Sequence, residues 1–435
     1  MGASLRRQAA DHYPSDMRVL LVAAGSRGDV QPFVALGVGL RRAGHEVTVC
    51  STGDFGSLVR EHGLAFIGSK LSATAVMDSE LGREWLGHSS HNQFVELRRF
   101  RAFVRTWGVR MAGETAALAG SFDLVISGVL TAYGSQALAD ASGARHVIAL
   151  LAPFEPTRAG WAGVQAPLPD RWSRRNLVAG IMGSWILADI IRPPGERVRE
   201  LLGLPRGNRR QVRQVFRGTP TLLGFSAAVV PPPADWSSGQ LITGYWFLDD
   251  GAPPEPERGR IEEFLAAGDP PVYVGFGSMS TRDAAGTMAS IVEALARTGR
   301  RGIVSSGGAG LVSAGEESDD VLLVGPVPHS WLLPQCAGAI HHGGAGTTAA
   351  ALAAGIPQGV VAHIGDQPYW GRRVSELGVG ASPIRRHELS ADSLTAMIAD
   401  VVDPVRKLRA IALGDRIRAE DGVARAVAQL SELVR

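Results

Sequence analysis

The segment that most restricts the fold of this chain is a glycine-rich run from His341 to Thr348, with the sequence HHGGAGTT. It follows an apolar segment, Cys336 to Ile340, that is typical of a buried strand, and it precedes an alanine-rich helix former, Ala349 to Ala354. In a strand–turn–helix unit, glycines let the backbone approach a phosphate, and the first N–H groups of the helix point at it. A lone Gly-Gly pair would indicate an ordinary turn, but the flanking histidine and threonines favour an anion site.

Length and composition limit the class of protein. At 435 residues the chain exceeds the size at which one hydrophobic core stops growing, so we expect two domains. Hydrophobic residues make up 45% and charged residues 20%, as in a packed globular protein. A net charge of +2 with scattered arginines does not indicate a nucleic-acid partner. The two cysteines, Cys50 and Cys336, predict buried thiols in a reducing, cytoplasmic setting.

Strand and helix patterns alternate in two series, which predicts an α/β protein with two doubly wound parallel sheets. The first series opens with a strand at Val19 to Ala24, a turn from Gly25 to Asp29 and a helix from about Pro32 to Ala43. The second series opens with a strand at Val272 to Phe276. We expect the two domains to face each other across a cleft.

Proline-rich stretches and charge patterns suggest the boundaries. Residues 1–16 are polar and lack the apolar core of a signal peptide, so they predict a disordered leader. An N-terminal domain is expected over 17–234, ending at the triple proline of residues 231–233, and a C-terminal domain over 235–415. The last segment, 416–435, predicts an amphipathic helix that packs back on the N-terminal domain.

Two segments of the first half, 70–110 and 153–215, interrupt the alternation and carry five tryptophans: Trp85, Trp107, Trp161, Trp172 and Trp185. Long insertions after sheet strands are where α/β proteins build ligand-specific walls, so these segments predict an apolar ligand. The apolar stretch Leu177 to Ile191 is too short to span a membrane and contains Asp189. It suits a helix of the core or of the ligand cleft; peripheral membrane contact is the alternative.

Polar residues at the predicted strand ends suggest a transfer reaction. His342 could donate to a phosphate, and Gly277-Ser278 could approach that phosphate from the other side. Asp366-Gln367 follows a predicted strand and could bracket the hydroxyls of a sugar, or Asp366 could only cap the next helix. Asp29 faces the cleft from the opposite domain and could act as a general base, or could also be a helix cap.

Other sequence patterns argue against a metal site and against a dinucleotide-dependent enzyme. Asp249-Asp250 and Asp319-Asp320 lie in polar loops without a nearby histidine or third carboxylate, so we expect no metal. No Gly-x-Gly-x-x-Gly follows the first strand, which argues against a dinucleotide oxidoreductase.

Three segments of the chain resemble one family. Residues 25–32 (GSRGDVQP) are similar to the amino-terminal signature of sterol glucosyltransferases and bacterial antibiotic glycosyltransferases. Residues 325–348, from GPVPHSWL through HHGGAGTT, and 365–371 (GDQPYWG) look like the donor-binding region of these enzymes. The resemblance covers most of residues 17–430. It implies the two-domain GT-B fold and inversion of the anomeric centre without a metal.

The resemblance also implies residue roles. Asp29 matches the family's general base, Asp366 and Gln367 match positions that hold sugar hydroxyls, and Val327 lies where a backbone group meets the pyrimidine base. Positions around the diphosphate are matched by Ser278, His342, Gly343, Gly344, Gly346, Thr347 and Thr348. The chain departs from sterol enzymes before Gly-Asp-Gln, where it carries Ala362-His363-Ile364 in place of Pro-Phe-Phe.

Together these features predict an inverting glycosyltransferase that moves a hexose from a UDP- or dTDP-sugar to a hydroxyl of a hydrophobic natural-product aglycone. The nucleotide sugar is a co-substrate, so no cofactor is expected, and the protein is expected to be a monomer or a weak homodimer. The alternatives are a sterol or lipid glucosyltransferase, a GT-B nucleotide-sugar epimerase, and a non-catalytic binding subunit. The presence of Asp29 argues against the last of these.

Overall fold

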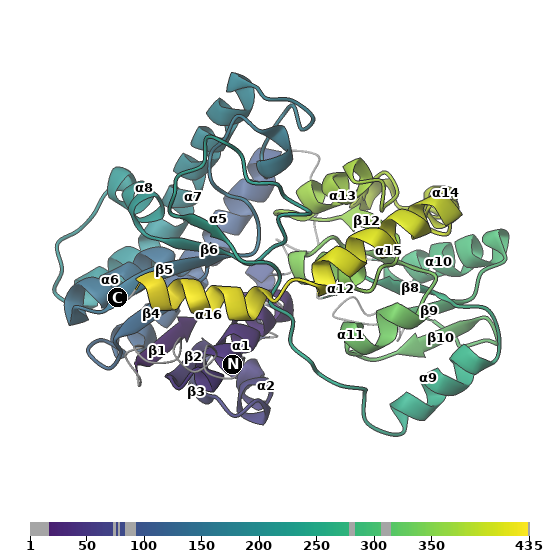
Figure 1. Ribbon diagram of the computed structural model, residues 1–435, viewed down its shortest axis with the longest axis horizontal. Helices are drawn as coiled ribbons and strands as arrows, with labels where there is room; N and C mark the ends of the chain where they lie inside the picture. The colour runs from purple at the N-terminus through teal and green to yellow at the C-terminus, as the bar shows by residue number, and fades with distance from the viewer. Residues whose placement is uncertain are drawn as a thin grey trace, which may run out of the picture.

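The structure, a computed structural model, describes residues 17–72, 75–76, 79–82, 93–277, 283–305 and 315–433. Strands of these residues form two wholly parallel sheets, one of seven strands and one of six, and helices flank both of them (Figure 1). The α/β class with two doubly wound domains is confirmed. The predicted leader, Trp85 and Ser278 lie outside the described residues.

The N-terminal sheet has the order β3-β2-β1-β4-β5-β6-β7. Its strands are β1 (Arg18–Val22), β2 (Glu46–Thr52), β3 (Ala65–Ser69), β4 (Leu124–Ser127), β5 (Arg145–Leu150), β6 (Thr221–Leu223) and β7 (Gln240–Ile242). The central strands β1 and β4 are almost entirely buried, because helices cover both faces of a parallel sheet.

The C-terminal sheet has the order β10-β9-β8-β11-β12-β13. Its strands are β8 (Val272–Gly275), β9 (Gly302–Ser305), β10 (Val321–Val324), β11 (Gly338–His341), β12 (Gln358–Ala362) and β13 (Ile384–Arg385). In both sheets the strand order reverses beside the first strand, between β1 and β4 and between β8 and β11. Ligands of doubly wound proteins bind at such a reversal, beyond the carboxyl ends of the strands.

Helices cover the sheets and connect the domains (Figure 1). The N-terminal domain carries α1 (Arg27–Arg42), α2 (Gly56–Glu61), α5 (Gln93–Ala116), α6 (Ala132–Ser142), α7 (Arg174–Leu201) and α8 (Arg209–Gly218). The C-terminal half carries α9 (Glu257–Ala266), α10 (Ala284–Thr298), α11 (His329–Leu332), α12 (Ala345–Ala353), α13 (Gln367–Glu376), α14 (Ala391–Val401), α15 (Pro404–Arg418) and α16 (Gly422–Leu433).

Helix α1 begins five residues earlier than the sequence predicts. It starts at Arg27 rather than near Pro32, because Ser26 has the extended conformation of an N-cap and Asp29, the third helical residue, accepts from its backbone N–H. Asp29 therefore lies in the first turn of a helix and not in a preceding loop. Pro32 lies inside the helix.

The N-terminal domain also extends further along the chain than predicted. We expected the C-terminal domain from residue 235, but β7 pairs in parallel with β6 and so completes the first sheet. Trp246 and Leu248 beyond it pack in the core of the same domain. A short, half-buried edge strand with little alternation gives no clear sequence signal, which is why the boundary was placed too early.

The last helix, α16, lies against the N-terminal sheet domain (Figure 1). Ala426 and Leu430 are fully buried in the core that contains Phe33 and Leu40 of α1. A Cβ atom on Gly39 of α1 would stand 2.3 Å from a methyl group of Val423, so a side chain at that glycine would push the two helices apart.

The two domains also touch directly through α13. Trp370 packs on Phe225 with ring centroids 6.5 Å apart, and one apolar cluster contains residues of both domains. Tyr369 donates a hydrogen bond to the carbonyl of Trp161 at 2.8 Å, and Arg373 donates to the carbonyl of Val229 at 2.7 Å. These contacts fix the start of α13 against the N-terminal domain.

Candidate active site

The predicted phosphate site lies at the strand reversal of the C-terminal sheet. Strands β8 and β11 are paired, with His341 opposite Gly275, so the loops that follow them leave the sheet side by side. Gly277 has a positive φ of 59°, and a Cβ atom there would come within 2.8 Å of the His342 ring. The His342 imidazole thus lies directly against the first loop of the domain.

Of the two adjacent histidines, His341 is structural. It is fully buried, and its Nδ1 accepts from the N–H of Gly343 at 3.0 Å. Nε2 therefore carries the proton and donates to Oε1 of Gln358 at 2.8 Å. These two bonds fix the turn that precedes α12.

His342 is held in the loop between Gly277 and Gly344. A Cβ atom on Gly344 would stand 2.5 Å from Nε2 of His342, so glycine is required for the ring to fit there. The pKa of His342 is lowered to about 3, mainly by burial and then by the neighbouring His363 and His329, while a hydrogen bond with the backbone of Gly275 opposes this. A neutral imidazole suits a hydrogen-bond donor rather than a fixed positive charge.

Helix α12 begins with backbone amides that could bind an anion. Gly344 is its N-cap, and the first helical backbone bond runs from Thr348 N–H to Gly344 C=O at 2.9 Å, so the amides before Thr348 have no acceptor within the helix. The turn before it needs a glycine at residue 343, where φ is 85° and a Cβ atom would stand 2.6 Å from Val360.

The two threonines of α12 differ in how far they are buried. Thr347 is half-buried, whereas Thr348 is fully buried and its hydroxyl has no hydrogen-bond partner among the described residues. Thr347 is therefore the hydroxyl that a phosphate at the helix terminus can reach directly.

Asp29 stands opposite this terminus, on the other domain. A Cβ atom on Gly346 would lie 3.4 Å from the Cα of Gly28, so the first turns of α12 and α1 touch across the domain interface. Asp29 Oδ2 accepts from the backbone N–H of Ser26 at 2.7 Å and from its hydroxyl at 3.0 Å. The carboxylate reaches solvent although protein atoms surround it; burial raises its pKa, and both Ser26 bonds oppose this.

Asp366 lies close to Asp29. Burial raises the pKa of Asp366 to about 6, the indole of Trp370 lowers it, and the negative charge of Asp29 raises it. The Trp370 bond, 2.9 Å from Nε1 to Oδ2, orients the carboxylate; Asp366 precedes α13 but its side chain makes no capping bond. Asp366 thus holds the N-cap position of α13, but its side chain bonds Trp370 instead of capping the helix.

Gln367 has a largely structural position. It is buried, and its Oε1 accepts from the backbone N–H groups of His363 and Ile364 at 2.8 and 2.9 Å. The side chain thus closes the loop between β12 and α13, and its oxygen is already used within the protein.

At the other end of the site, Val327 lies between β10 and α11, partly buried against the core of its domain. Arg27 and Asp250 of the first half influence the neighbouring His329, whose pKa is lowered to about 4 mainly by burial, then by Arg27. Asp250 Oδ2 accepts from Arg27 at 2.9 Å and from Gln31 at 2.7 Å.

That network corrects one expectation. We expected no histidine near Asp249-Asp250, but Nε2 of His62 lies 4.0 Å from Asp250 Oδ1. In the described part of the chain, no group of three or more histidine, cysteine or acidic side chains that could hold an ion is found.

Sequence reasoning missed His363 as a site residue. Its ring lies 5.9 Å from that of Phe276, and neither of its buried nitrogens has a hydrogen-bond partner within the described ranges. Burial lowers its pKa to about 3, so the imidazole is neutral. The sequence signal that could have identified His363 is that it stands where sterol enzymes carry the first phenylalanine of Pro-Phe-Phe.

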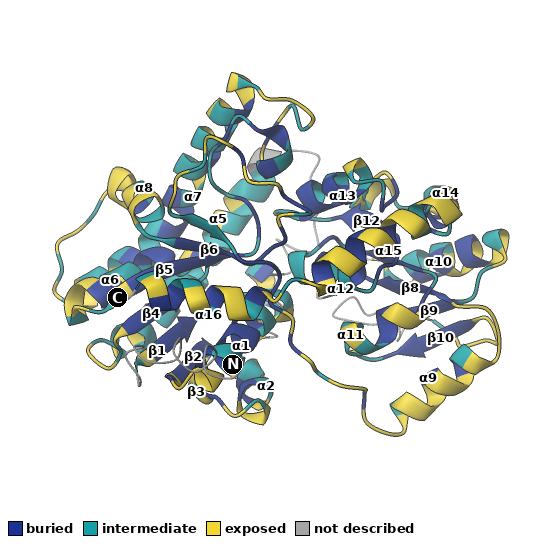
Figure 2. Cartoon of the chain, viewed as in Figure 1, coloured by how far each residue is buried: buried dark blue, intermediate teal, exposed yellow. Residues whose placement is uncertain are grey.

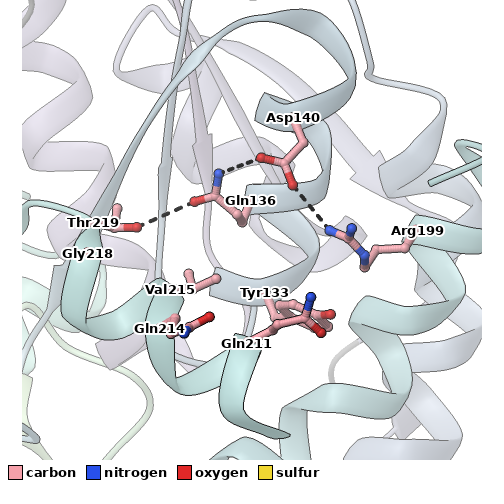
Figure 3. A pocket seen from close by; sticks show the side chains of 9 residues that line it. All are labelled: Tyr133, Gln136, Asp140, Arg199, Gln211, Gln214, Val215, Gly218 and Thr219. Carbon is pink, nitrogen blue, oxygen red and sulfur yellow. Dashed lines mark hydrogen bonds and ion pairs between the residues drawn. The ribbon is translucent and has the colours of Figure 1, made fainter. Parts of the chain in front are cut away.

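A separate hollow of about 380 Å³ lies on the N-terminal domain between α6, α7 and α8. Figure 3 shows that its polar groups pair with one another: Asp140 accepts from Gln136 and is paired with Arg199. None of the predicted site residues lines it. The hollow is therefore distinct from the phosphate and carboxylate arrangement at the domain interface.

Comparisons with known proteins agree with this geometry. Residues 19–118 match the glycosyltransferase family 28 N-terminal domain, and residues 300–432 match the C-terminal domain of the erythromycin biosynthesis protein CIII-like family. A sterol 3-beta-glucosyltransferase of Arabidopsis thaliana is 34% identical over 94% of this chain and 67% of its own length. The O-mycaminosyltylonolide 6-deoxyallosyltransferase of Streptomyces fradiae is 31% identical over 96% of this chain and 97% of its own.

The chain belongs to the family of GT-B glycosyltransferases that contains these enzymes. It spans about two thirds of the plant sterol relatives and about a quarter to a third of several fungal ones, such as the 26% covered in Debaryomyces hansenii.

Solved structures show the same fold. The glycosyltransferase of kitacinnamycin matches with a TM-score of 0.65 at 19% identity, covering 96% of this chain and 99% of that one. The glycosyltransferase VinC, solved in complex with dTDP, matches with a TM-score of 0.64 at 21% identity, covering 96% of this chain and all of that one. The GT-B fold of this glycosyltransferase is confirmed.

The two histidines give a testable contrast. His341→Ala leaves buried groups of Gly343 and Gln358 unpaired, each costing about 1–3 kcal/mol, and should lower the free energy of unfolding markedly. His342→Ala should lower it less but weaken UDP binding. Denaturant unfolding and titration calorimetry measure the two effects; similar stability losses in both variants, with unchanged UDP affinity, would contradict the division of roles.

Proposed function

We propose that this glycosyltransferase moves a hexose from a UDP- or dTDP-sugar to a hydroxyl of a hydrophobic natural-product aglycone, with inversion and without a metal. The observation that carries the proposal is the contact between the first turns of α1 and α12, which brings a carboxylate of one domain opposite a helix terminus of the other. A base and an anion site on opposite walls suit attack and departure on opposite faces of one carbon.

In the proposed reaction, Asp29 takes the proton of the acceptor hydroxyl, and the oxygen attacks the anomeric carbon. The bond from that carbon to the β-phosphate oxygen breaks, and its electrons leave with the nucleoside diphosphate. The amides of Gly344 to Thr347 and the hydroxyl of Thr347 stabilise the added charge. An α-linked donor sugar yields a β-glycoside.

Asp366 is proposed to accept from a hydroxyl of the donor sugar, since Trp370 orients its carboxylate and it lies near Asp29. The sequence also predicts a sugar contact for Gln367. In this proposal its side chain acts mainly by holding the loop between β12 and α13 in place. Val327 is proposed to contact the pyrimidine base of the nucleotide. Ser278 and His342 are proposed to contact its diphosphate. The VinC complex with dTDP supports a nucleoside diphosphate as ligand for the fold.

A sterol or lipid acceptor is the second candidate. The sterol glucosyltransferases among the relatives favour it, whereas the deoxyallosyltransferase of Streptomyces fradiae favours an antibiotic aglycone and is matched over nearly its whole length. Mass spectrometry with UDP-glucose and dTDP-glucose against a sterol, a macrolide aglycone and a flavonoid distinguishes them by which acceptor gains a hexose. An epimerised donor without any acceptor would instead indicate an epimerase.

Replacing the proposed base should abolish transfer while the fold is kept. Asp29→Asn keeps an oxygen that can accept from Ser26 but is no base, so kcat should fall about 10²- to 10⁴-fold while UDP affinity is unchanged. Ser26→Ala is the matched control, because it removes one hydrogen bond and leaves the carboxylate. Near-normal turnover by Asp29→Asn would rule out this base.

The pH dependence follows from the raised pKa of Asp29. A base must be ionised, so kcat/KM should be lost as pH falls through this raised pKa, above the ~3.9 of an ordinary aspartate. The pKa of Asp366 is also raised, to about 6. Because the Ser26 hydroxyl lowers the pKa of Asp29, Ser26→Ala should move the acidic limb to higher pH; an unmoved limb, or one moved downward, would contradict the assignment.

His363 should influence donor choice. Two unpartnered imidazole nitrogens can pair with a donor hydroxyl, whereas the phenylalanine of sterol enzymes would not. His363→Phe should therefore reduce kcat/KM for UDP-glucose about 10-fold more than for a deoxysugar donor, the worth of about one hydrogen bond. UDP affinity is the control and should stay constant. Equal losses with both donors would assign His363 a packing role only.

A further inference from the structure

The first half of α7 exposes large apolar side chains along one face. Val178, Met182 and Ile186 are spaced four residues apart and are 54%, 60% and 39% exposed. Trp172, just before the helix, is 47% exposed. Residues four apart lie on one side of a helix, so Val178, Met182 and Ile186, here named the α7 apolar stripe, form a ridge rather than isolated positions.

The opposite face of this half is already packed on the protein. A Cβ atom on Gly183 would overlap Gln165, and one on Gly180 would stand 3.0 Å from Pro156. The buried side chain of Asn176 donates to the carbonyls of Arg158, Leu168 and Arg171. The helix is therefore fixed with its stripe outward.

Helix α7 is not a membrane span. It is the helix of the described residues that is long and apolar enough to cross a bilayer: within its 28 residues an 18-residue window has a mean hydropathy of 1.2. Its second half, however, is part of the core: Ala188, Ile190 and Ile191 are buried, and Asp189 pairs with Arg101 and Arg209. In Figure 1 this half lies between α5 and α8, whereas Figure 2 marks exposed residues along the helix.

The segment around the stripe is strongly basic. Between residues 153 and 218 the chain carries twelve arginines and five acidic residues, a formal charge of +7, although the whole protein carries only +2. Arg174 and Arg175 are exposed next to Trp172 at the start of the helix, and the exposed Arg171 pairs with Asp170. Anionic lipid attracts each such residue by about 1 kcal/mol, and tryptophan favours the bilayer interface.

We propose that the α7 apolar stripe and the arginines at its start form a docking surface for an anionic lipid bilayer. Apolar side chains flanked by arginines fit the acyl and phosphate layers of such a membrane. A second copy of the chain would bring like charges together, and a nucleic acid offers no partner for the apolar side chains.

The surface is connected to the active site, an extension that rests on the proposed function. Trp172 lies 6.4 Å from Trp161, ring centroid to ring centroid, and the carbonyl of Trp161 accepts from Tyr369 in α13, three residues after Asp366. A hydrophobic acceptor dissolved in the bilayer would thus reach the protein beside the segment that leads to Asp366.

Sedimentation with vesicles tests the docking surface without donor or acceptor. The full-length protein should bind vesicles of phosphatidylcholine with phosphatidylglycerol, bind those of phosphatidylcholine alone much less, and be released by salt. Met182→Glu should weaken vesicle binding at least ~10-fold, as expected for the loss of one apolar side chain that the bilayer would bury. The double variant Arg174→Gln, Arg175→Gln should weaken it similarly.

Matched controls lie on other helices. Leu408→Glu changes a 69% exposed leucine of α15, and Arg425→Gln changes an exposed arginine of α16; neither should affect vesicle binding. UDP affinity should be unchanged in all variants. No binding to anionic vesicles, equal binding to neutral ones, or equal losses in the controls would overturn the proposal.

Two further outcomes would assign the stripe differently. A wild-type dimer in sedimentation analysis that Met182→Glu dissociates, without vesicle binding, would indicate a surface for a second copy. Loss of turnover by Met182→Glu with a water-soluble acceptor would indicate that the stripe lines the acceptor site. Because vesicle binding needs no catalysis, an inactive protein that still binds anionic vesicles would refute the proposed function and leave the docking surface intact.

Discussion

The parallel pairing of β8 with β11 is the constraint on which the active site depends. It places two strand ends side by side where the strand order reverses, so the loops after them converge. One loop contributes Gly277 and the other the turn into α12, and the His342 ring fills the space between them. Glycines at residues 277 and 343 are needed for positive φ, and glycine at 344 is needed because the ring occupies the place of a side chain.

The second constraint is the contact of two helix termini across the domain interface. The first turns of α1 and α12 meet at Gly28 and Gly346, where unpaired amides and the positive ends of both helix dipoles lie. Two carboxylates, Asp29 and Asp366, lie near the same place; burial is the main cause of the raised pKa of Asp366, and the charge of Asp29 adds to it. A diphosphate there would add negative charge that the amides compensate, so binding of the ligand and the proton affinity of both carboxylates are coupled.

Long, strongly patterned elements were predictable from the sequence, and weakly patterned ones were not. The βα alternation predicted both sheets, and the run from His341 to Thr348 predicted a strand, a turn and a helix terminus that the structure contains. The start of α1 was misplaced because Pro32 suggested a helix beginning, whereas the Ser26–Asp29 capping interaction sets it earlier. Strand β7 was missed as part of the first sheet because three half-buried residues carry no periodic signal.

Contacts between distant segments lie beyond such patterns. Nothing local in the sequence indicates that Asp250 receives hydrogen bonds from α1, or that Gln367 uses its oxygen to close its own loop. His341 and His342 are identical and adjacent, but their surroundings differ. Successive residues at the end of a strand point to opposite sides of the sheet, so one imidazole enters the core and pairs with Gln358, whereas the next lies against Gly277 at the loop. Which of the two imidazoles enters the core is thus decided by the parity of the strand.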